Sequence, residues 1–123
     1  MCFVCSGQAE CNLEDGILHS STESPLTALG RAQAAKVGER LKDEKYDLVY
    51  SSDLSRAYDT GLAIVGDPSK MIKDTQLRER DFGIFENQPN SVFMEAVEKI
   101  RPEGQSWSEA FYKVMFCYEN FTI

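Results

Sequence analysis

The stretch that decides the fold is YDLVYSSDLSRAYDTGLAIVGDPSKMIK, residues 46–73. Its apolar run at 48–50 is typical of a short, fully buried parallel strand. A helix is expected over about 54–65, with Asp53 placed to cap its first turn and Gly-Asp-Pro to end it. Residues 71–73 favour a second strand. Strand, helix and strand in this order predict an α/β fold with a parallel sheet and right-handed crossovers.

The same alternation continues on both sides of this stretch. Residues 1–5 favour a short buried strand, followed by a polar loop over 6–26. Thr27 is expected to cap a helix that runs to about Lys42, and Asn90 a third helix that ends near residue 100. A last helix is expected from Ser106 or Ser108. The first of these helices has small and apolar residues at helical spacing, which would let it lie close against a sheet: Gly30, Ala34, Val37 and Leu41.

Length and composition indicate one soluble domain over residues 1–123, with 42% hydrophobic and 27% charged residues. No apolar stretch approaches the roughly 20 residues of a membrane helix, and no signal peptide precedes the first strand, so a cytoplasmic protein is expected. The net charge of −7 argues against binding to nucleic acid, because the phosphate backbone favours clustered Lys and Arg. A small anionic substrate remains compatible with it, since such a site needs only a few converging donors.

The four cysteines do not suggest a disulfide framework in such a protein. Three of them, Cys2, Cys5 and Cys11, form with the only histidine, His19, the run C-x2-C-x5-C-x7-H. Zinc can use such ligands. However, Cys2 and Cys5 would point to opposite faces of the expected strand because their separation is odd. Buried or half-buried thiols are therefore the favoured interpretation, and we expect no metal and no cofactor.

Three loops are expected at the carboxyl ends of the strands, where ligands bind in open parallel sheets. They cover residues 5–12, 51–56 and 77–83. Because parallel strands end at the same edge, these loops should converge and form the candidate site.

Five segments in these loops and helices resemble the histidine phosphatase superfamily, the phosphoglycerate-mutase-like enzymes. They follow the order and spacing of that family nearly from end to end of the chain: FVCSGQAECN (3–12), SPLTALGRAQAAKVGERL (24–41), YDLVYSSDLSRAYDT (46–60), LRERDFGIFEN (77–87) and PEGQSWSEA (102–110). The pairing of LRERDFG with PEGQS is similar to the fructose-2,6-bisphosphatase branch.

The resemblance implies a fold and an activity. The fold is a three-layer α/β sandwich with a mainly parallel sheet, here cut short at the C-terminal side. The activity is hydrolysis of a phosphomonoester through a phosphohistidine, without a cofactor. The implied substrate is a small phosphorylated sugar, fructose 2,6-bisphosphate, whose removal damps glycolysis.

The resemblance also assigns roles to five positions. Ser6 stands where the family has its nucleophilic His, and Cys5 where it has a phosphate-binding Arg. Asn12 and Arg56 match phosphate-contacting residues, and Glu79 matches the proton donor. The run HSS at 19–21 replaces a loop that usually contains Gln and Gly, and the chain ends before the segment that carries the family's second His. Little or no turnover is therefore expected.

Other interpretations stay open at this point. The chain can be a non-catalytic pseudophosphatase that binds phosphate esters or protein partners. Ser6 could be activated by His19, whereas a cysteine phosphatase is disfavoured because the position six after Cys5, where its Arg should stand, is Cys11. Arg56 could simply pair with Asp53 or Asp59 on the surface.

A missing central strand would also leave an open sheet edge. Such an edge favours self-association or a partner that supplies the missing strand.

Overall fold

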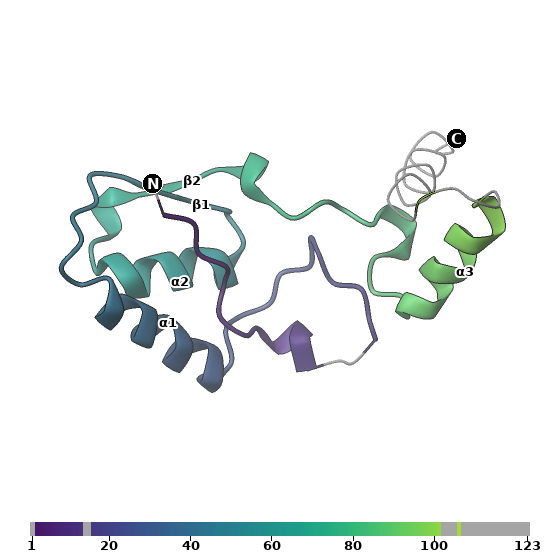
Figure 1. The fold of residues 1–123 in the computed structure, drawn as a ribbon, viewed down its shortest axis with the longest axis horizontal. Helices are drawn as coiled ribbons and strands as arrows, with labels where there is room; N and C mark the ends of the chain where they lie inside the picture. The colour runs from purple at the N-terminus through teal and green to yellow at the C-terminus, as the bar shows by residue number, and fades with distance from the viewer. Residues whose placement is uncertain (1, 14–15, 102–105, 107–123) are drawn as a thin grey trace. The chain divides into compact units, whose positions relative to one another are not determined.

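The computed structural model describes residues 2–13, 16–101 and 106 (Figure 1). They belong to two compact units, one formed by Met1–Glu14 with Glu23–Glu79 and the other by Asp15–Thr22 with Arg80–Ile123. The fold class is the expected one, α/β with a parallel strand pair. The elements in chain order are α1 (Ala28–Arg40), β1 (Val49–Ser51), α2 (Ser55–Val65), β2 (Met71–Lys73) and α3 (Asn90–Ile100), with short 3-10 helices at Glu10–Leu13, Pro68–Lys70, Thr75–Leu77 and Gly83–Phe85.

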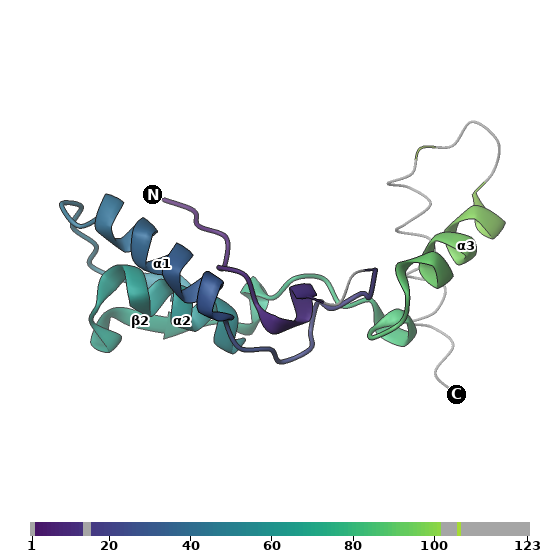
Figure 2. The same ribbon diagram turned by 90° about the horizontal axis from the view of Figure 1, so that it is seen from below.

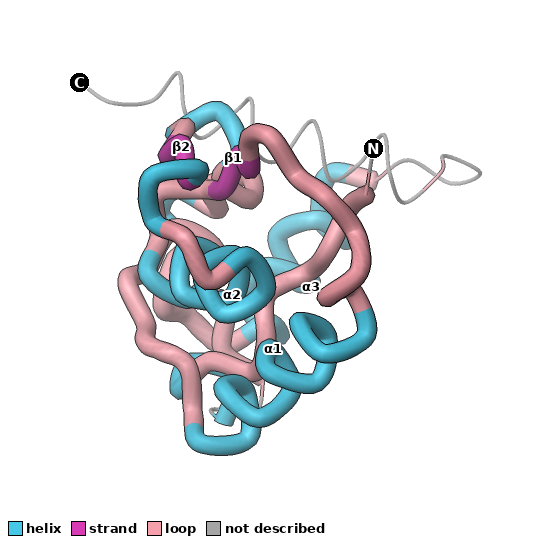
Figure 3. Tube along the Cα trace, turned by 90° about the vertical axis from the view of Figure 1, so that its left-hand side faces the viewer, coloured by secondary structure: helices cyan, strands magenta, loops and turns pink. Residues whose placement is uncertain are grey.

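The β1–α2–β2 unit confirms the expected order of strand, helix and strand for residues 46–73. The expected full burial of the first strand was wrong, since Leu48 and Tyr50 are 55% and 59% exposed. The strands β1 and β2 pair in parallel, with Val49 opposite Met71 and Ser51 opposite Lys73. Helix α2 contacts both strands and also α1, which lies beside it in Figure 2. Seen end-on in Figure 3, the strands, α2 and α1 follow one another as successive layers. Gly66 ends α2 in the left-handed conformation with φ of 70°, which a residue without Cβ adopts at low cost.

Helix α1 begins as expected and lies close to α2. The Thr27 side chain caps it by accepting a hydrogen bond from the Gly30 N–H at 3.0 Å. At Gly30 its predicted small face meets the backbone of Gln8, while on another side a Cβ added to Gly38 would stand 2.8 Å from the Ala63 carbonyl oxygen on α2. Gly38 therefore allows the two helix backbones to approach closely, and packing of the predicted face on a sheet stays a prediction.

Two predicted caps do not form. Helix α2 has Leu54 at its N-cap position with no side-chain cap, because the Asp53 carboxylate accepts hydrogen bonds from the Arg78 guanidinium instead. Helix α3 has Pro89 at its N-cap, and the Asn90 N–H donates to the Gly16 carbonyl. For Asp53, a contact distant in sequence thus uses the carboxylate that the local pattern assigned to the helix end, whereas Asn90 lies inside α3 as its first residue.

The predicted buried strand over residues 1–5 was also wrong. Residues 2–5 have no regular structure, and Phe3 and Val4 are 85% and 45% exposed. An extended segment becomes a strand only by pairing, and from Gly7 onward this backbone pairs elsewhere. The Gln8 carbonyl accepts from the Thr27 N–H at 2.9 Å, and Ala9 forms an antiparallel bridge with Leu26. The chain is thereby directed to the start of α1.

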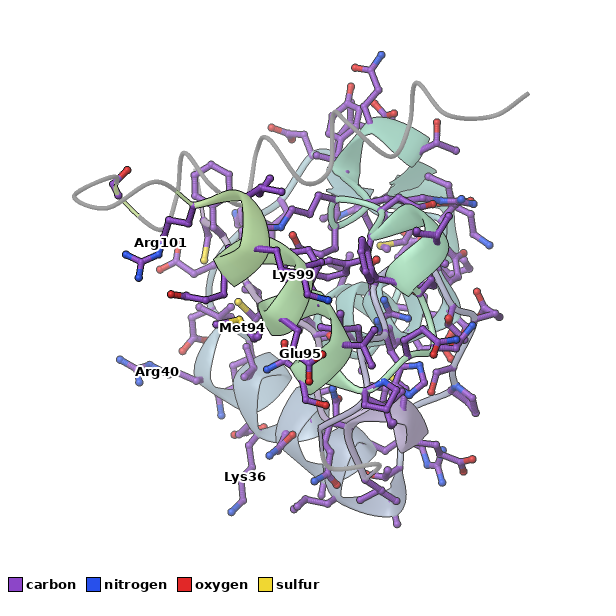
Figure 4. All side chains as sticks on the ribbon, turned by 90° about the vertical axis from the view of Figure 1, so that its right-hand side faces the viewer. Lys36, Arg40, Met94, Glu95, Lys99 and Arg101 are labelled. Carbon is purple, nitrogen blue, oxygen red and sulfur yellow. The ribbon has the colours of Figure 1, made fainter. Side chains whose placement is uncertain are left out.

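The second unit has a small aromatic core. Phe85, Phe93 and Val97 are buried, and Phe93 makes edge-to-face contacts with Phe82 and Phe85, with ring centroids 5.3 Å apart in each case. On the other side of α3, Glu95 and Lys99 extend into open space (Figure 4). The helix thus has one apolar side, with Phe93 and Val97 in the core and Ala96 packed against it, whereas Ile100 is 37% exposed.

The remaining expectations of this stage fall outside what the structure tests. The helix expected from Ser106 or Ser108 lies outside the described residues. Single-domain organisation over 1–123 and self-association stay predictions. In the part of the chain that the structure describes, no helix is both long enough and apolar enough to cross a membrane.

Candidate active site

The loop that carries Cys5 and Ser6 is fixed to the start of α1 by close backbone contact. A Cβ on Gly7 would stand 2.4 Å from the Gly30 carbonyl oxygen, and one on Gly30 would stand 2.0 Å from the Gln8 carbonyl oxygen. These distances are far shorter than van der Waals contact, so both positions need glycine. The Gln8 N–H also donates to Gln33 Oε1 at 2.9 Å. Residues 5–8 therefore cross α1 at one defined place.

The same loop is tied to α2 through one hydroxyl group. The Gly7 N–H donates to Thr60 Oγ1 at 3.0 Å, and the Thr60 hydroxyl donates to the Arg56 carbonyl at 2.7 Å. Thr60 is 4% exposed. The loop at 5–12 is thus joined to α2, the helix that follows the loop at 51–56, although residues 2–5 do not form the strand on which the predicted convergence was based.

Asn12 has a structural partner in this loop. Its Oδ1 accepts a hydrogen bond from the Ala9 N–H at 2.8 Å, and its own N–H donates to the Ala9 carbonyl at 3.0 Å. Cys11, the neighbouring residue, is buried, and its N–H donates to Ser24 Oγ. Asn12 itself is exposed. The amide oxygen closes a tight turn, while the amide NH2 is the part of the side chain that can donate to an anion.

Arg56 lies in the first turn of α2, next to an acidic partner. The Ser55 N–H donates to Glu23 Oε1 at 3.0 Å. Hydrogen bonding from Ser55 lowers the pKa of the Glu23 carboxyl, and the nearby charge of Arg56 lowers it further. Asp53, one of the two acidic residues that the sequence offered as a partner for Arg56, pairs with Arg78.

The third loop reaches this region through Arg78. Its Nε donates to Asp53 Oδ1 at 2.7 Å, and its NH2 group donates to the other carboxylate oxygen. This two-pronged hydrogen bond lowers the pKa of Asp53. Glu79 is the next residue and is exposed, so the contact anchors the segment that carries the predicted proton donor. Its role as proton donor stays a prediction.

A depression of about 220 Å³ lies at Cys5 and Ser6, with these lining residues: Cys5, Ser6, Gly7, Gln33, Ala34, Val37 and Thr60. None of them carries a formal charge, and none is an imidazole. A phosphoryl group needs cations or many N–H donors around its oxygens. The surroundings of Ser6 therefore supply a hydroxyl and a thiol, but neither the nucleophile nor the positive charge that phosphoryl transfer to histidine requires.

The cysteines differ from their predicted burial. Cys11 is buried as expected, but Cys2 and Cys5 are exposed, because residues 2–5 do not enter the sheet. Among the described residues, no three His, Cys, Asp or Glu side chains are grouped so that they could hold a metal ion. The Ser6–His19 pair stays a hypothesis, and the described ring contact of His19 is a 3.0 Å hydrogen bond between its Nδ1 and Asn87 Oδ1.

Sequence reasoning missed Glu86, whose carboxylate accepts several hydrogen bonds from one short segment of the second unit. Its Oε1 accepts from the N–H groups of three consecutive residues, Ser20, Ser21 and Thr22, at 2.7, 2.9 and 3.1 Å. The hydroxyls of Ser20 and Thr22 also donate to this carboxylate. Partial burial opposes the charge, but these hydrogen bonds outweigh it and lower the pKa of Glu86 from 4.5 to about 2.

Ser51 is the other feature that the sequence did not indicate. It lies at the carboxyl end of β1, and its hydroxyl is buried without a hydrogen-bond partner among the described residues. The run HSS at 19–21 and the motif FEN at 85–87 were the available signals for the Glu86 contact. They are 65 residues apart, so only the fold joins them.

The α/β fold, with a parallel strand pair and a loop at Ser6 joined to α1 and α2, is of the phosphoglycerate-mutase-like class. The family model described as "Histidine phosphatase superfamily (branch 1)" matches residues 1–119. The chain therefore belongs to the histidine phosphatase superfamily, as its five motifs indicated.

Named relatives agree with this membership. The chain is 35% identical over 92 residues to fructose-2,6-bisphosphatase TIGAR B of Danio rerio, covering 71% of the chain and 36% of that protein. It is 32% identical over 92 residues to the probable phosphoglycerate mutase GpmB of Yersinia enterocolitica, covering 73% and 39%. Thus the chain spans less than two fifths of either relative.

Among solved structures, the chain is similar to a phosphoglycerate mutase from Bacillus anthracis, with a TM-score of 0.67 and 30% identity. That match covers 76% of this chain and 43% of the mutase. Fold and sequence thus agree on one family, whose members here include both phosphatases and mutases.

Proposed function

We propose that this chain carries the phosphate-ester site of a fructose-2,6-bisphosphatase-type histidine phosphatase but has little or no turnover. In this proposal the ligand is a small phosphorylated sugar, and the parent activity is hydrolysis of fructose 2,6-bisphosphate in the cytoplasm, which damps glycolysis. The similarity to TIGAR B and the LRERDFG motif support this substrate class over the mutase alternative.

One observation carries the loss of turnover: Ser6 follows Cys5 at the position that the family motif gives to an Arg-His pair. In the parent reaction an imidazole nitrogen attacks phosphorus, the ester oxygen leaves with a proton from the acid at Glu79, and water then releases phosphate. A serine hydroxyl needs a base to attack, and the residues that line the depression at Ser6 include none. Loss of a nucleophile lowers rates on the order of 10³- to 10⁶-fold.

Retained binding without turnover, as in a pseudophosphatase, is supported by the two phosphate-contacting positions of the family motif that keep their residue type, Asn12 and Arg56. Arg56 is a permanent cation on the first turn of α2, where backbone N–H groups also favour anions. Asn12 lies in the loop that follows Ser6, and its turn is closed by its own side chain. These groups can hold a phosphate without taking part in a covalent step.

The decisive experiment measures phosphate release and binding separately. Purified 123-residue chain is incubated with fructose 2,6-bisphosphate and with p-nitrophenyl phosphate, and binding of each is measured by calorimetry. We expect binding that Arg56→Ala weakens and no phosphate release above buffer. Release that disappears in Ser6→Ala would overturn the proposal, because it would make Ser6 a working nucleophile.

A restoration variant gives the complementary test. The double substitution Cys5→Arg with Ser6→His returns the motif pair to the loop, and trapping with p-nitrophenyl phosphate should then yield an acid-labile phosphohistidine. Ser91→His, which places a new imidazole on the exposed side of α3, is the matched control and should remain unlabelled.

A further inference from the structure

We propose that Thr60 is a positioning residue of the phosphate site: its hydroxyl sets the loop at Ser6 in register with the turn of α2 that carries Arg56. This inference rests on the proposed function, because it takes the bound ligand to be a phosphate ester. Thr60 belongs to α2, while Gly7 lies 53 residues away in the loop.

The geometry uses both hydrogen-bonding capacities of one hydroxyl. The Thr60 hydroxyl donates to the Arg56 carbonyl oxygen, with 2.7 Å between the two oxygens. It also accepts from the Gly7 N–H, with 3.0 Å between nitrogen and oxygen. Thr60 is 4% exposed, so water does not readily replace either partner. Loss of the hydroxyl would leave the Gly7 N–H without its partner in a poorly hydrated place, which is unfavourable for the loop as it stands.

This arrangement differs from the ordinary behaviour of threonine in a helix. A Thr hydroxyl often donates to the carbonyl four residues earlier, which by itself slightly destabilises the helix and bends it. Here the oxygen that makes this bond is also the acceptor for a distant loop. The contact therefore acts between two segments and is not confined to one helix.

The consequence follows from where the two ends lie. Gly7 is directly bonded to Ser6, and Arg56 is one helical turn before Thr60 on the same side of α2. The contacts of Gln8 fix the loop to α1, whereas the Thr60 contact fixes it to α2. A ligand that touches both Arg56 and the loop must find them at a set spacing, and a shift of about 1 Å can cost on the order of 10²-fold at such sites.

The test compares Thr60→Val, which keeps the shape and removes the hydroxyl, with Thr60→Ser, which keeps the hydroxyl. The control is Thr75→Val at an exposed threonine of a 3-10 helix. Two quantities are measured in the full chain: the Kd for fructose 2,6-bisphosphate, and the hydrogen-exchange rate of the Gly7 amide by NMR. Thr60→Val should raise Kd about tenfold and speed Gly7 exchange, while Thr60→Ser and Thr75→Val should stay within about twofold of the original chain.

Several outcomes separate a positioning role from a merely structural one. Faster Gly7 exchange with an unchanged Kd would overturn the inference, since the contact would then matter only for the loop's order. Equal exchange in Thr60→Val and the original chain would also overturn it. If the original chain binds no ester, the proposed function fails, and Gly7 exchange alone then decides whether Thr60 sets the loop.

Should Thr60→Val fail to fold, Thr60→Cys supplies a weaker hydrogen-bonding group of similar size. It should show an intermediate rise in both quantities, and an unchanged Kd with this variant would count against the inference in the same way.

Discussion

Neutralising Glu86 should destabilise the second unit, and the effect should depend on pH. The carboxylate accepts hydrogen bonds from three successive backbone N–H groups and two hydroxyls, a concave arrangement of donors that binds anions. Glu86→Gln keeps an oxygen acceptor but removes the charge and turns the second oxygen into a donor. The NH2 group would then face the Ser20 hydroxyl, which at present donates to that second oxygen.

The magnitude follows from the pKa of this carboxyl. A fall from 4.5 to about 2 corresponds to roughly 3 kcal/mol at 1.36 kcal/mol per pKa unit. The side chain is only partly buried, so solvent screening reduces the expected value to about 1–2 kcal/mol. Because the folded-state pKa is depressed, this stability is fully present above pH 4.5 and is lost as the pH falls toward 2.

Two measurements are made at pH 7 and at pH 2.5. Urea unfolding gives the free energy of unfolding, and hydrogen exchange gives the exchange rates of the amides of residues 20–22. At pH 7, Glu86→Gln should exchange these amides about 5- to 30-fold faster than the original chain, which is the factor that about 1–2 kcal/mol predicts. At pH 2.5 the two chains should approach one another. The control is Glu95→Gln on the exposed side of α3 (Figure 4), which should change stability by no more than about 0.5 kcal/mol. A constant difference between Glu86→Gln and the original chain at both pH values would refute the reasoning.

Three further outcomes follow from the packing. Ser51→Ala should be neutral or stabilising by up to about 1 kcal/mol in thermal unfolding, since it removes a buried hydroxyl that has no hydrogen-bond partner among the described residues. A loss of stability above about 1 kcal/mol would mean that this hydroxyl forms a hydrogen bond. Gly30→Ala should disrupt the first unit, because its Cβ would stand 2.0 Å from the Gln8 carbonyl oxygen. Ala32→Gly is the control for helix propensity. A thermal unfolding midpoint of Gly30→Ala close to that of the original chain would show that the loop moves away from α1 freely. Phe93→Ala should lower the free energy of unfolding of the second unit by about 3–5 kcal/mol, which would be measured as faster hydrogen exchange of the α3 amides. A decrease below about 1 kcal/mol would contradict the aromatic core.

Local sequence pattern was sufficient for the elements whose signals lie within a few residues. The β1–α2–β2 unit was predictable because a β-favouring run, a helical period and Gly-Asp-Pro follow one another without conflict. Thr27 was predictable as a cap because its acceptor and the Gly30 N–H are three residues apart. In each case the physical interaction and the sequence signal have the same short range.

Errors arose where a distant partner competed for the same group. Asp53 has the chemistry of a helix cap, but a guanidinium offers it two charge-assisted hydrogen bonds, which are stronger than one bond to a backbone amide. Residues 2–5 have the composition of a strand, but a strand needs a neighbour, and the chain beyond them is committed to α1. Glu86 looked like one charge among many, because its donors come from a segment 64 to 66 residues earlier.

Under the proposed loss of turnover, the residues around Ser6 indicate how a scaffold could persist without its chemistry. Gly7 and Gly30 permit the crossing of loop and helix, and Thr60 joins that loop to α2. None of these three residues would exchange atoms with a phosphate ester. Cys5 and Ser6 are the neighbouring residues and are exposed, so we expect that substitutions at these two positions change the folding free energy little. The family motif around Ser6 therefore predicts the fold, because its glycines are needed for close backbone contact. Family activity depends instead on the side chains at positions 5 and 6, which the fold does not require.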